Sequence, residues 1–430
     1  MRTHLPALLL ALCWVLPGHA ADKKPDFSGQ KLSEVRFVGN AVTSLKLLED
    51  QGCPVAGDPV DESAIAQCQQ TLMNLGLFES VKTQLLPDPK GPILEIRVKE
   101  KIYILPLPTA SRSPDGLFSY GGEFTWDNVA GLNQRLRFKV ENKEEADNRT
   151  VTRTQFEYNV PRFVGTTWGM NLSIHQDSSK ETVTSENDTQ SGVYKYRSLG
   201  WSLGTSRWIR EIRPNQGLQW SGGVNWGRTE YNYVSGTPGL AEDKTNITYS
   251  TGLTFTTVDD TGYSRQGGYY GINLGLGIQP LGSRYNSQTV NLQYIRYYPI
   301  GAYPAINWNS RFQLGAASGP DLKGTSYAIG GADSLRGYDK ASIEGDWYML
   351  YNTNLLIPIN RFPEFRWALF ADIGNAWRYG KTKLDELKYG VGVGARWRIR
   401  FLVNTDLRLD IAWAPGQKEV KYYAGSNTQF

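Results

Sequence analysis

From about residue 101 onward, apolar and polar residues alternate along the chain with a period of two. In "LFSYGGEFTWDN", Phe118, Tyr120, Phe124 and Trp126 fall on one face and polar residues on the other. Because successive side chains of a β-strand point to opposite faces, this pattern predicts strands with one apolar face. The period recurs in later segments, for example at Leu136, Phe138 and Val140; Trp168, Met170, Leu172 and Ile174; Ile272, Leu274, Leu276 and Ile278; and Leu407, Leu409, Ile411 and Trp413.

Polar stretches rich in Asn, Asp, Gly and Ser separate these segments, and long ones such as "DSSKETVTSENDTQSG" alternate with short ones such as "VPRFVGTT". The alternation is typical of a barrel with long loops at one rim and short turns at the other. Residues 101–430 are therefore predicted to form a 16-stranded antiparallel transmembrane β-barrel, since about 20 residues per strand allow a spanning strand and a connection. A soluble β-sandwich or propeller also alternates, but it does not place Trp and Tyr at strand ends so often.

Residues 28–100 follow a different pattern. A short strand, "LSEVRFVGN", precedes an amphipathic helix that begins near Leu45 and ends near Gly52. Asp61 is placed to cap a second helix, which ends at Gly76, and two further strands follow. The order β-α-α-β-β predicts a small α+β domain in front of the barrel.

The first 20 residues have the form of a secretory signal peptide: Arg2 precedes an apolar run, and small residues end at Ala20. Cys13 raises the alternative of a lipoprotein, but the bulky Leu12 before it does not suit lipid attachment. Export leaves Cys53 at the end of the first helix and Cys68 within the second. In an oxidising compartment these two cysteines favour a disulfide, whereas a redox-active pair lacks the C-x-x-C spacing.

Composition excludes several classes of protein. Beyond the signal peptide one histidine remains, His175, and no nucleophile elbow or metal-ligand cluster accompanies it, so we expect no enzyme, metal or cofactor. The net charge of +4, from 46 basic and 42 acidic residues, argues against nucleic-acid binding. No apolar run outside the signal peptide approaches the length of a membrane-spanning helix. A mean hydropathy of −0.42 with 12% aromatic residues and 45 glycines suits a β-barrel in the outer membrane of a Gram-negative bacterium.

Two motifs carry a family resemblance. "GGADSLRGY" and "FADIGNAW", together with "VRFVGN" and "LGLFESVKTQ" in the first domain, resemble the POTRA-barrel superfamily of outer-membrane insertases and translocases, the BamA/TamA-like or bacterial surface antigen type. The chain resembles a member with a single POTRA domain. The resemblance covers nearly the whole chain after the signal peptide.

The resemblance implies a loop that folds back into the barrel lumen, where Arg336 pairs with Asp372. Asp372 shares a strand face opposite the apolar Leu369 and Ile373, so it points into the lumen if those residues meet lipid. The alternative is a solvated surface loop. The residues concerned are Gly330, Gly331, Leu335, Arg336, Gly337 and Tyr338 in the loop motif, and Phe370, Asp372 and Gly374 in the strand motif.

The place where the barrel closes has an unusual composition. The first strand contains Pro106 and Pro108, which lack amide donors, and the last strand contains Gly425 and ends at Phe430. Ser426 and Thr428 stand where barrels of this family usually have apolar residues. We therefore hypothesise that this seam is a lateral gate.

The function implied by the resemblance is insertion or translocation of a polypeptide without catalysis. The expected partners are an unfolded or extended client polypeptide, outer-membrane lipids, and a periplasmic or inner-membrane protein that binds the POTRA domain; nucleic acid is not expected. The POTRA sheet edge is a candidate acceptor for an extended client segment. Two alternatives of different classes are a lipid or polysaccharide conduit and a plain diffusion porin, which needs neither the POTRA domain nor the loop.

Overall fold

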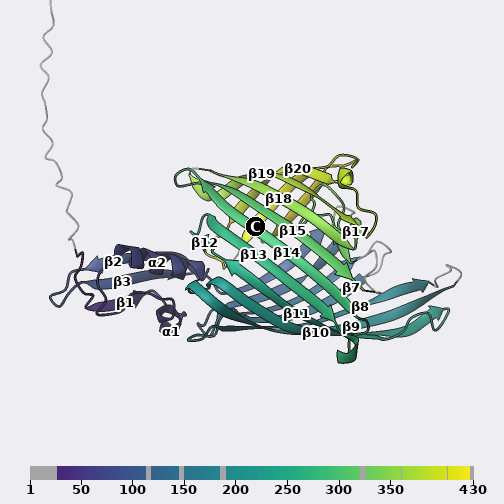
Figure 1. The fold of residues 1–430 in the computed structure, drawn as a ribbon, viewed down its shortest axis with the longest axis horizontal. Helices are drawn as coiled ribbons and strands as arrows, with labels where there is room; N and C mark the ends of the chain where they lie inside the picture. Colours follow the sequence, from purple (N-terminus) through teal and green to yellow (C-terminus); the bar gives the residue numbers. More distant parts are fainter. Residues whose placement is uncertain are drawn as a thin grey trace, which may run out of the picture.

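The computed structural model of the chain describes residues 27–112, 118–144, 150–184, 190–319, 326–359, 361–403 and 405–426. A small α+β domain leads into a large antiparallel barrel, which confirms the predicted fold class (Figure 1). The predicted signal peptide, Thr428 and Phe430 lie outside the described residues. No helix in the described part of the chain is long and apolar enough to cross a membrane.

The N-terminal domain, called the POTRA-like domain below, has the predicted order of elements. They are β1 (Glu34–Val38), α1 (Leu45–Glu49), α2 (Glu62–Asn74), β2 (Phe78–Leu86) and β3 (Ile93–Glu100). The sheet order is β1-β3-β2, with β1 parallel and β2 antiparallel to β3. Asp61 caps α2 by accepting a hydrogen bond from the Ser63 amide at 2.8 Å, and hydrogen bonds from Ser63 lower the pKa of the Asp61 carboxyl.

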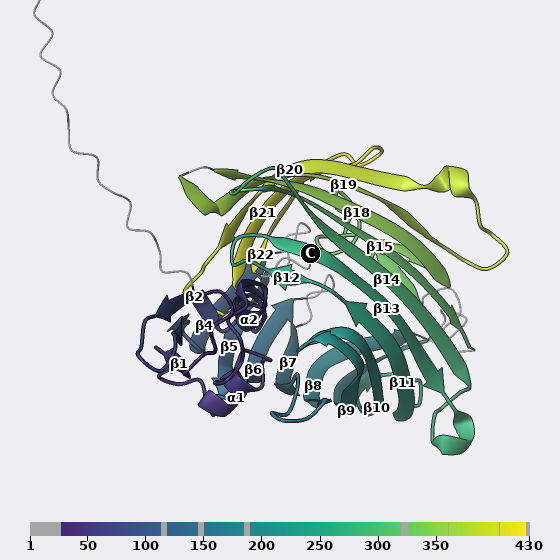
Figure 2. The same ribbon diagram turned by 60° about the vertical axis from the view of Figure 1, so that its left-hand side comes forward.

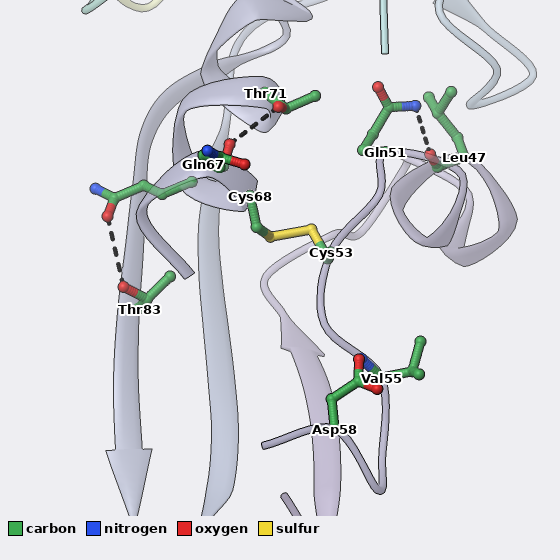
Figure 3. The surroundings of a disulfide bond; sticks show 10 residues. Leu47, Gln51, Cys53, Val55, Asp58, Gln67, Cys68, Thr71 and Thr83 are labelled. Atoms are coloured by element: carbon green, nitrogen blue, oxygen red, sulfur yellow. Dashed lines mark hydrogen bonds between the residues drawn. A yellow bond between two sulfur atoms is a disulfide. The ribbon is translucent and has the colours of Figure 1, made fainter. Parts of the chain in front are cut away.

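The helices pack on the sheet through a small apolar core in which Leu48, Leu72 and Leu94 are fully buried. A disulfide joins Cys53, just after α1, to Cys68 in the middle of α2, as predicted (Figure 3). It closes a loop of 15 residues and ties the segment after α1 to α2. Because so small a domain buries little apolar surface, this link matters for its stability.

Sixteen strands of six to 23 residues form the barrel in the described part of the chain, in agreement with the predicted number. Each pairs with its neighbours in sequence, and β22 lies beside β4 to close the sheet. The strands are β4 (Ile104–Arg112), β5 (Phe118–Val129), β6 (Gln134–Glu144), β7 (Thr150–Val160), β8 (Trp168–Thr184), β9 (Ser191–Arg213), β10 (Gln216–Gly236), β11 (Lys244–Thr256), β13 (Arg265–Gly277), β14 (Ser287–Ile300), β15 (Ile306–Ser318), β18 (Trp347–Ile359), β19 (Phe362–Trp377), β20 (Lys388–Arg398), β21 (Asp406–Trp413) and β22 (Lys421–Ser426). A two-residue strand, β12 (Asp259–Asp260), continues the direction of β11 and pairs with β13.

The outer face of the barrel carries the apolar residues that the sequence pattern predicts. On β19, Trp367 and Leu369 are 55% and 46% exposed, whereas Phe370 and Asp372 are 5% and 2% exposed. Alternate residues therefore face lipid and lumen. Strand length is uneven: β9 has 23 residues, whereas β21 has 8, and β8, β9 and β10 run well beyond their neighbours at the end remote from the POTRA-like domain (Figure 1).

The POTRA-like domain lies at one end of the barrel (Figure 2), and polar contacts join the two. The Asn74 side chain at the end of α2 donates to Asp259 Oδ1 at 2.8 Å and accepts from the Asp260 amide at 2.9 Å. Arg400 in the β20–β21 turn donates to the Glu79 carbonyl of β2 at 3.1 Å. Contacts to β12 and to the β20–β21 turn thus fix the orientation of the POTRA-like domain at this end of the lumen.

Candidate functional site in the barrel lumen

The loop between β15 and β18 folds back into the lumen instead of leaving the barrel. Two short strands within it, β16 (Tyr327–Ile329) and β17 (Ile343–Gly345), pair with each other and form a hairpin base. Leu335 is fully buried and Tyr338 is 6% exposed, within an apolar cluster that includes Leu350 on β18. The solvated surface loop considered as an alternative therefore does not describe this segment.

The structure brings Arg336 and Asp372 together in a buried, bidentate ion pair. Arg336 Nε and Nη2 each donate to an Asp372 carboxylate oxygen at 2.7 Å. The Arg336 backbone amide donates to the same carboxylate at 3.0 Å. The two residues are 3% and 2% exposed, so this charge-assisted fork forms out of contact with bulk water.

The surroundings of the pair satisfy its remaining polar groups. Arg336 Nη1 donates to the Asn354 side chain at 3.1 Å, and the guanidinium lies 3.6 Å from the centre of the Phe370 ring. The side-chain amide nitrogen of Asn352, on β18, donates to the Asp372 carboxylate at 2.8 Å and to the Ser334 carbonyl of the loop at 2.6 Å. Phe370 thus contributes a cation–π contact, and the amide of Asn352 links the loop to two strands.

A second buried ion pair, not foreseen from the sequence, lies beside the first. Arg396 on β20 donates to both carboxylate oxygens of Asp410 on β21, at 2.5 and 3.1 Å. Asp410 also lies 3.5 Å from Arg336 Nη1. The sequence does contain a signal for this pair, namely an arginine and an aspartate at lumen-facing positions of adjacent spanning strands. Such charges are costly in a membrane unless they pair.

The loop is also bound to the last strand of the barrel. Tyr423 Oη on β22 accepts a hydrogen bond from the Gly337 amide at 3.0 Å and donates to the Tyr338 carbonyl at 3.1 Å. Lys421 on the same strand pairs with Asp339 of the loop at 2.6 Å. The loop therefore holds β22, the strand that closes the barrel, from inside the lumen.

Glycines let the loop approach the wall this closely. Gly337 has φ +96°, and a Cβ there would lie 2.7 Å from the Ala414 side chain. Gly390 on β20 lies directly beneath Arg336, and a Cβ at Gly390 would collide with the Arg336 carbonyl oxygen. In the motif, Gly330 and Gly331 also have positive φ, and a Cβ at Gly374 on β19 would meet the neighbouring backbone of β18.

The edge of β4 that faces the seam lacks two donors. The Asp127 amide of β5 donates to the Tyr103 carbonyl at 2.7 Å, and the Ile102 amide points the other way, to the Phe401 carbonyl at 2.8 Å. Because main-chain groups alternate in direction along a strand, the even-numbered residues of β4 face away from β5 and toward β22. Pro106 and Pro108 are both even-numbered and have no N–H to offer there.

On the opposite side of this seam, the described part of β22 is six residues long and includes Gly425 and Ser426. Among the described residues, no cluster of histidine, cysteine or acidic side chains is arranged to hold a metal ion.

Comparison with known proteins identifies the barrel. Residues 128–430 match the Omp85 superfamily domain. No curated protein sequence matches the chain. Among solved structures, BamA from Haemophilus ducreyi lacking POTRA domains 1–3 matches with TM-score 0.53 at 15% identity, over 92% of this chain and 83% of that one. CdiB from Acinetobacter baumannii matches with TM-score 0.57 at 18% identity, over 93% and 73%, and CdiB from Escherichia coli with TM-score 0.59 at 11% identity, over 93% and 76%.

Proposed function

The chain belongs to the Omp85 superfamily and is an outer-membrane β-barrel protein of a Gram-negative bacterium, and from this premise we propose that it inserts or translocates polypeptides without catalysis. The client enters on the side of the POTRA-like domain. A client in the lumen then displaces the lumenal loop, and this displacement weakens the seam between β4 and β22.

The observation that carries this proposal is the double attachment of the loop. Arg336 anchors it to Asp372 on β19, in the wall, and Tyr423 anchors it to β22, at the seam. A displacement of the loop therefore removes contacts from the strand that closes the barrel. A diffusion porin needs no such link between its lumen and one particular pair of strands.

The seam supports a gate in a second way. Two donors are missing from the facing edge of β4, and unpaired backbone groups are costly in hydrocarbon. The seam is then the position in the closed sheet where strand separation is least costly, and where an edge becomes available to a client strand.

Two experiments test the proposal. Depletion of the protein followed by outer-membrane proteomics distinguishes the candidate functions: loss of barrel proteins supports insertion, and loss of one secreted protein supports translocation. Altered lipid asymmetry or surface polysaccharide with an unchanged proteome would instead support the lipid or polysaccharide conduit.

The second experiment locks the seam. Cysteines at Thr109 and Gly425, or at neighbouring pairs, are oxidised in the intact membrane, and activity is expected to disappear and to return on reduction. The matched control is a pair at Leu274 and Val290, which lie opposite each other on β13 and β14. Full activity with the seam locked would rule out a lateral gate.

The POTRA-like domain is proposed to bind the client or a periplasmic or inner-membrane partner through β1, an edge strand of its sheet. Deletion of residues 28–100 is expected to abolish client handling while the barrel still inserts. Unchanged activity after this deletion would show that the domain takes no part in client handling.

A further inference from the structure

A large cavity occupies the side of the lumen remote from the loop. Its volume is about 1030 Å³, and strands β5 to β11 and β13 form its wall. Asn74, Leu75 and Leu77, at the corner between α2 and β2, close it at the end that carries the POTRA-like domain. We call this cavity the lumen chamber. The Arg336–Asp372 pair and the loop do not contribute to it.

The wall of the lumen chamber is polar but almost without charge. Side-chain amides and hydroxyls dominate it, among them Asn171, Ser173, Ser202, Asn225, Ser250 and Asn273. Of the described residues that line the chamber, three are charged: Asp127, Arg135 and Glu157. Asp127 pairs with Arg135 at 2.5 Å, and Glu157 pairs with Arg137 at 2.8 Å. The wall therefore offers many neutral donors and acceptors and no unpaired charge of its own.

These groups form rows across the strands. Ser173, Ser202 and Asn225 are register partners on β8, β9 and β10. In the adjacent row, Gly204 and Gly223 carry no side chain, and the Asn171 side-chain amide occupies the space over Gly204. An extended chain that lies along this wall meets a neutral hydrogen-bonding group at regular intervals.

Beside the lumen chamber, one buried donor has no hydrogen-bond partner among the described residues. The Trp208 side chain is 8% exposed and lines the chamber, and its indole N–H has no hydrogen-bond partner among the described residues. A buried donor of this kind costs free energy while it is unsatisfied, but its nitrogen is too enclosed to select a ligand in the chamber by itself. The ring is too enclosed to offer an open face for stacking on a sugar.

From these observations we infer that the lumen chamber binds an extended, uncharged polar segment of polypeptide, rich in Asn, Ser, Thr and Gly, in preference to a charged one. The inference rests on the proposed function, since it names the kind of client segment that the barrel receives. Its physical basis is desolvation: a charged side chain loses water in the chamber and finds no unpaired opposite charge there. Uncharged amides and hydroxyls exchange water for equivalent partners on the wall.

The test uses the full chain in lipid nanodiscs, with Ser202→Cys labelled by an environment-sensitive fluorophore; Cys53 and Cys68 are already joined to each other. Three probes are titrated: a 12-residue peptide of Asn, Ser, Thr and Gly, a peptide of equal length with alternating Lys and Glu, and a linear neutral glucan oligosaccharide. We expect the uncharged peptide to bind at least about tenfold more tightly than the other two probes.

Two substitutions at one position sharpen the test. Asn225→Asp adds a charge of nearly the same shape and is expected to weaken binding of the uncharged peptide, whereas Asn225→Gln keeps the wall neutral and preserves it. Equal or tighter binding of the Lys/Glu peptide would overturn the inference, as would no binding by any probe. Tighter binding of the oligosaccharide would reassign the chamber to glycans. The locked-seam and depletion experiments do not depend on these titrations, so the proposed function stands or fails separately.

Discussion

The two halves of the barrel wall differ in charge and in what fills the lumen beside them. Strands β14 to β22, with the loop between β15 and β18, bury four arginines, namely Arg311, Arg336, Arg366 and Arg396. Strands β5 to β13 bury no arginine among the described residues and enclose the lumen chamber. A single sheet thus combines a wall that contains two buried ion pairs, Arg336–Asp372 and Arg396–Asp410, with a wall whose cavity is lined mainly by uncharged polar side chains. Substitutions of the same kind should therefore have unequal effects in the two halves.

The largest effect is expected at the Arg336–Asp372 pair. Removal of either side chain leaves the other charge buried, so Arg336→Ala or Asp372→Ala should each lower the free energy of unfolding by about 3–5 kcal/mol. The double variant should show a coupling energy above about 0.5 kcal/mol. Urea unfolding in detergent and heat-modifiable gel mobility measure both quantities.

Additive effects of the two substitutions would contradict a direct interaction between Arg336 and Asp372. We expect the Arg336→Ala barrel to remain folded but to function poorly, because the strands keep their own hydrogen bonds without the loop.

A methyl group beneath the loop should have the next largest effect. In Gly390→Ala the new Cβ meets the Arg336 carbonyl oxygen, so the loop must shift, at a cost of about 3 kcal/mol. The control is Gly227→Ala on β10, where a Cβ would have no neighbour within 4 Å. Urea unfolding compares the two variants. Equal unfolding midpoints would show that the loop is not in close contact with the wall at Gly390.

Truncation of one asparagine in each half sharpens the comparison further. Asn352→Ala removes the donor shared by Asp372 and the Ser334 carbonyl and should cost about 2 kcal/mol. Asn171→Ala, in the lumen chamber, should change stability by less than about 0.5 kcal/mol, because that side chain is exposed to the lumen. A large loss of stability in Asn171→Ala would mean that side chains of the lumen chamber also contribute to the stability of the barrel.

The smallest effect is expected from one hydroxyl at the seam. Tyr423→Phe removes two hydrogen bonds to the loop and should cost about 1 kcal/mol, together with faster oxidation of the seam cysteines. Tyr422→Phe is the matched control, since Tyr422 is 65% exposed on the outer face. An unchanged rate of seam cross-linking in Tyr423→Phe would show that the loop does not influence the opening of the seam.

The sequence predicted those features that repeat locally. Alternation identified the strands and their lipid-facing residues, and the cysteines and Asp61 predicted the disulfide and a helix cap, all of which the structure contains. The loop motif and Asp372 were recognised from two short segments that resemble a family. Each of these signals lies within one short segment, the longest being the 15-residue separation of the two cysteines.

The features that sequence reasoning missed depend on register or on distant contacts. Arg396 is opposite Arg408 in the register of β20 and β21, and Asp410 is opposite Gly394. Arg396 and Asp410 therefore meet diagonally across the two strands, on the same face of the sheet. The two hydrogen bonds of Tyr423 depend on how deeply the loop enters the lumen. Docking of Asn74 on β12 joins segments about 185 residues apart. Alternation gives the face of each side chain, but it does not give the partner across the sheet.

Pro106 and Pro108 also bear on how long a client would stay bound. A strand that added to the seam edge of β4 would find two amide donors absent, and each missing hydrogen bond raises the rate at which the strand dissociates. A fully donating edge would hold the client as firmly as the barrel holds its own strands, and the protein would then serve one client and stop. The two prolines therefore favour a short residence time, so that one barrel can release a client and accept another.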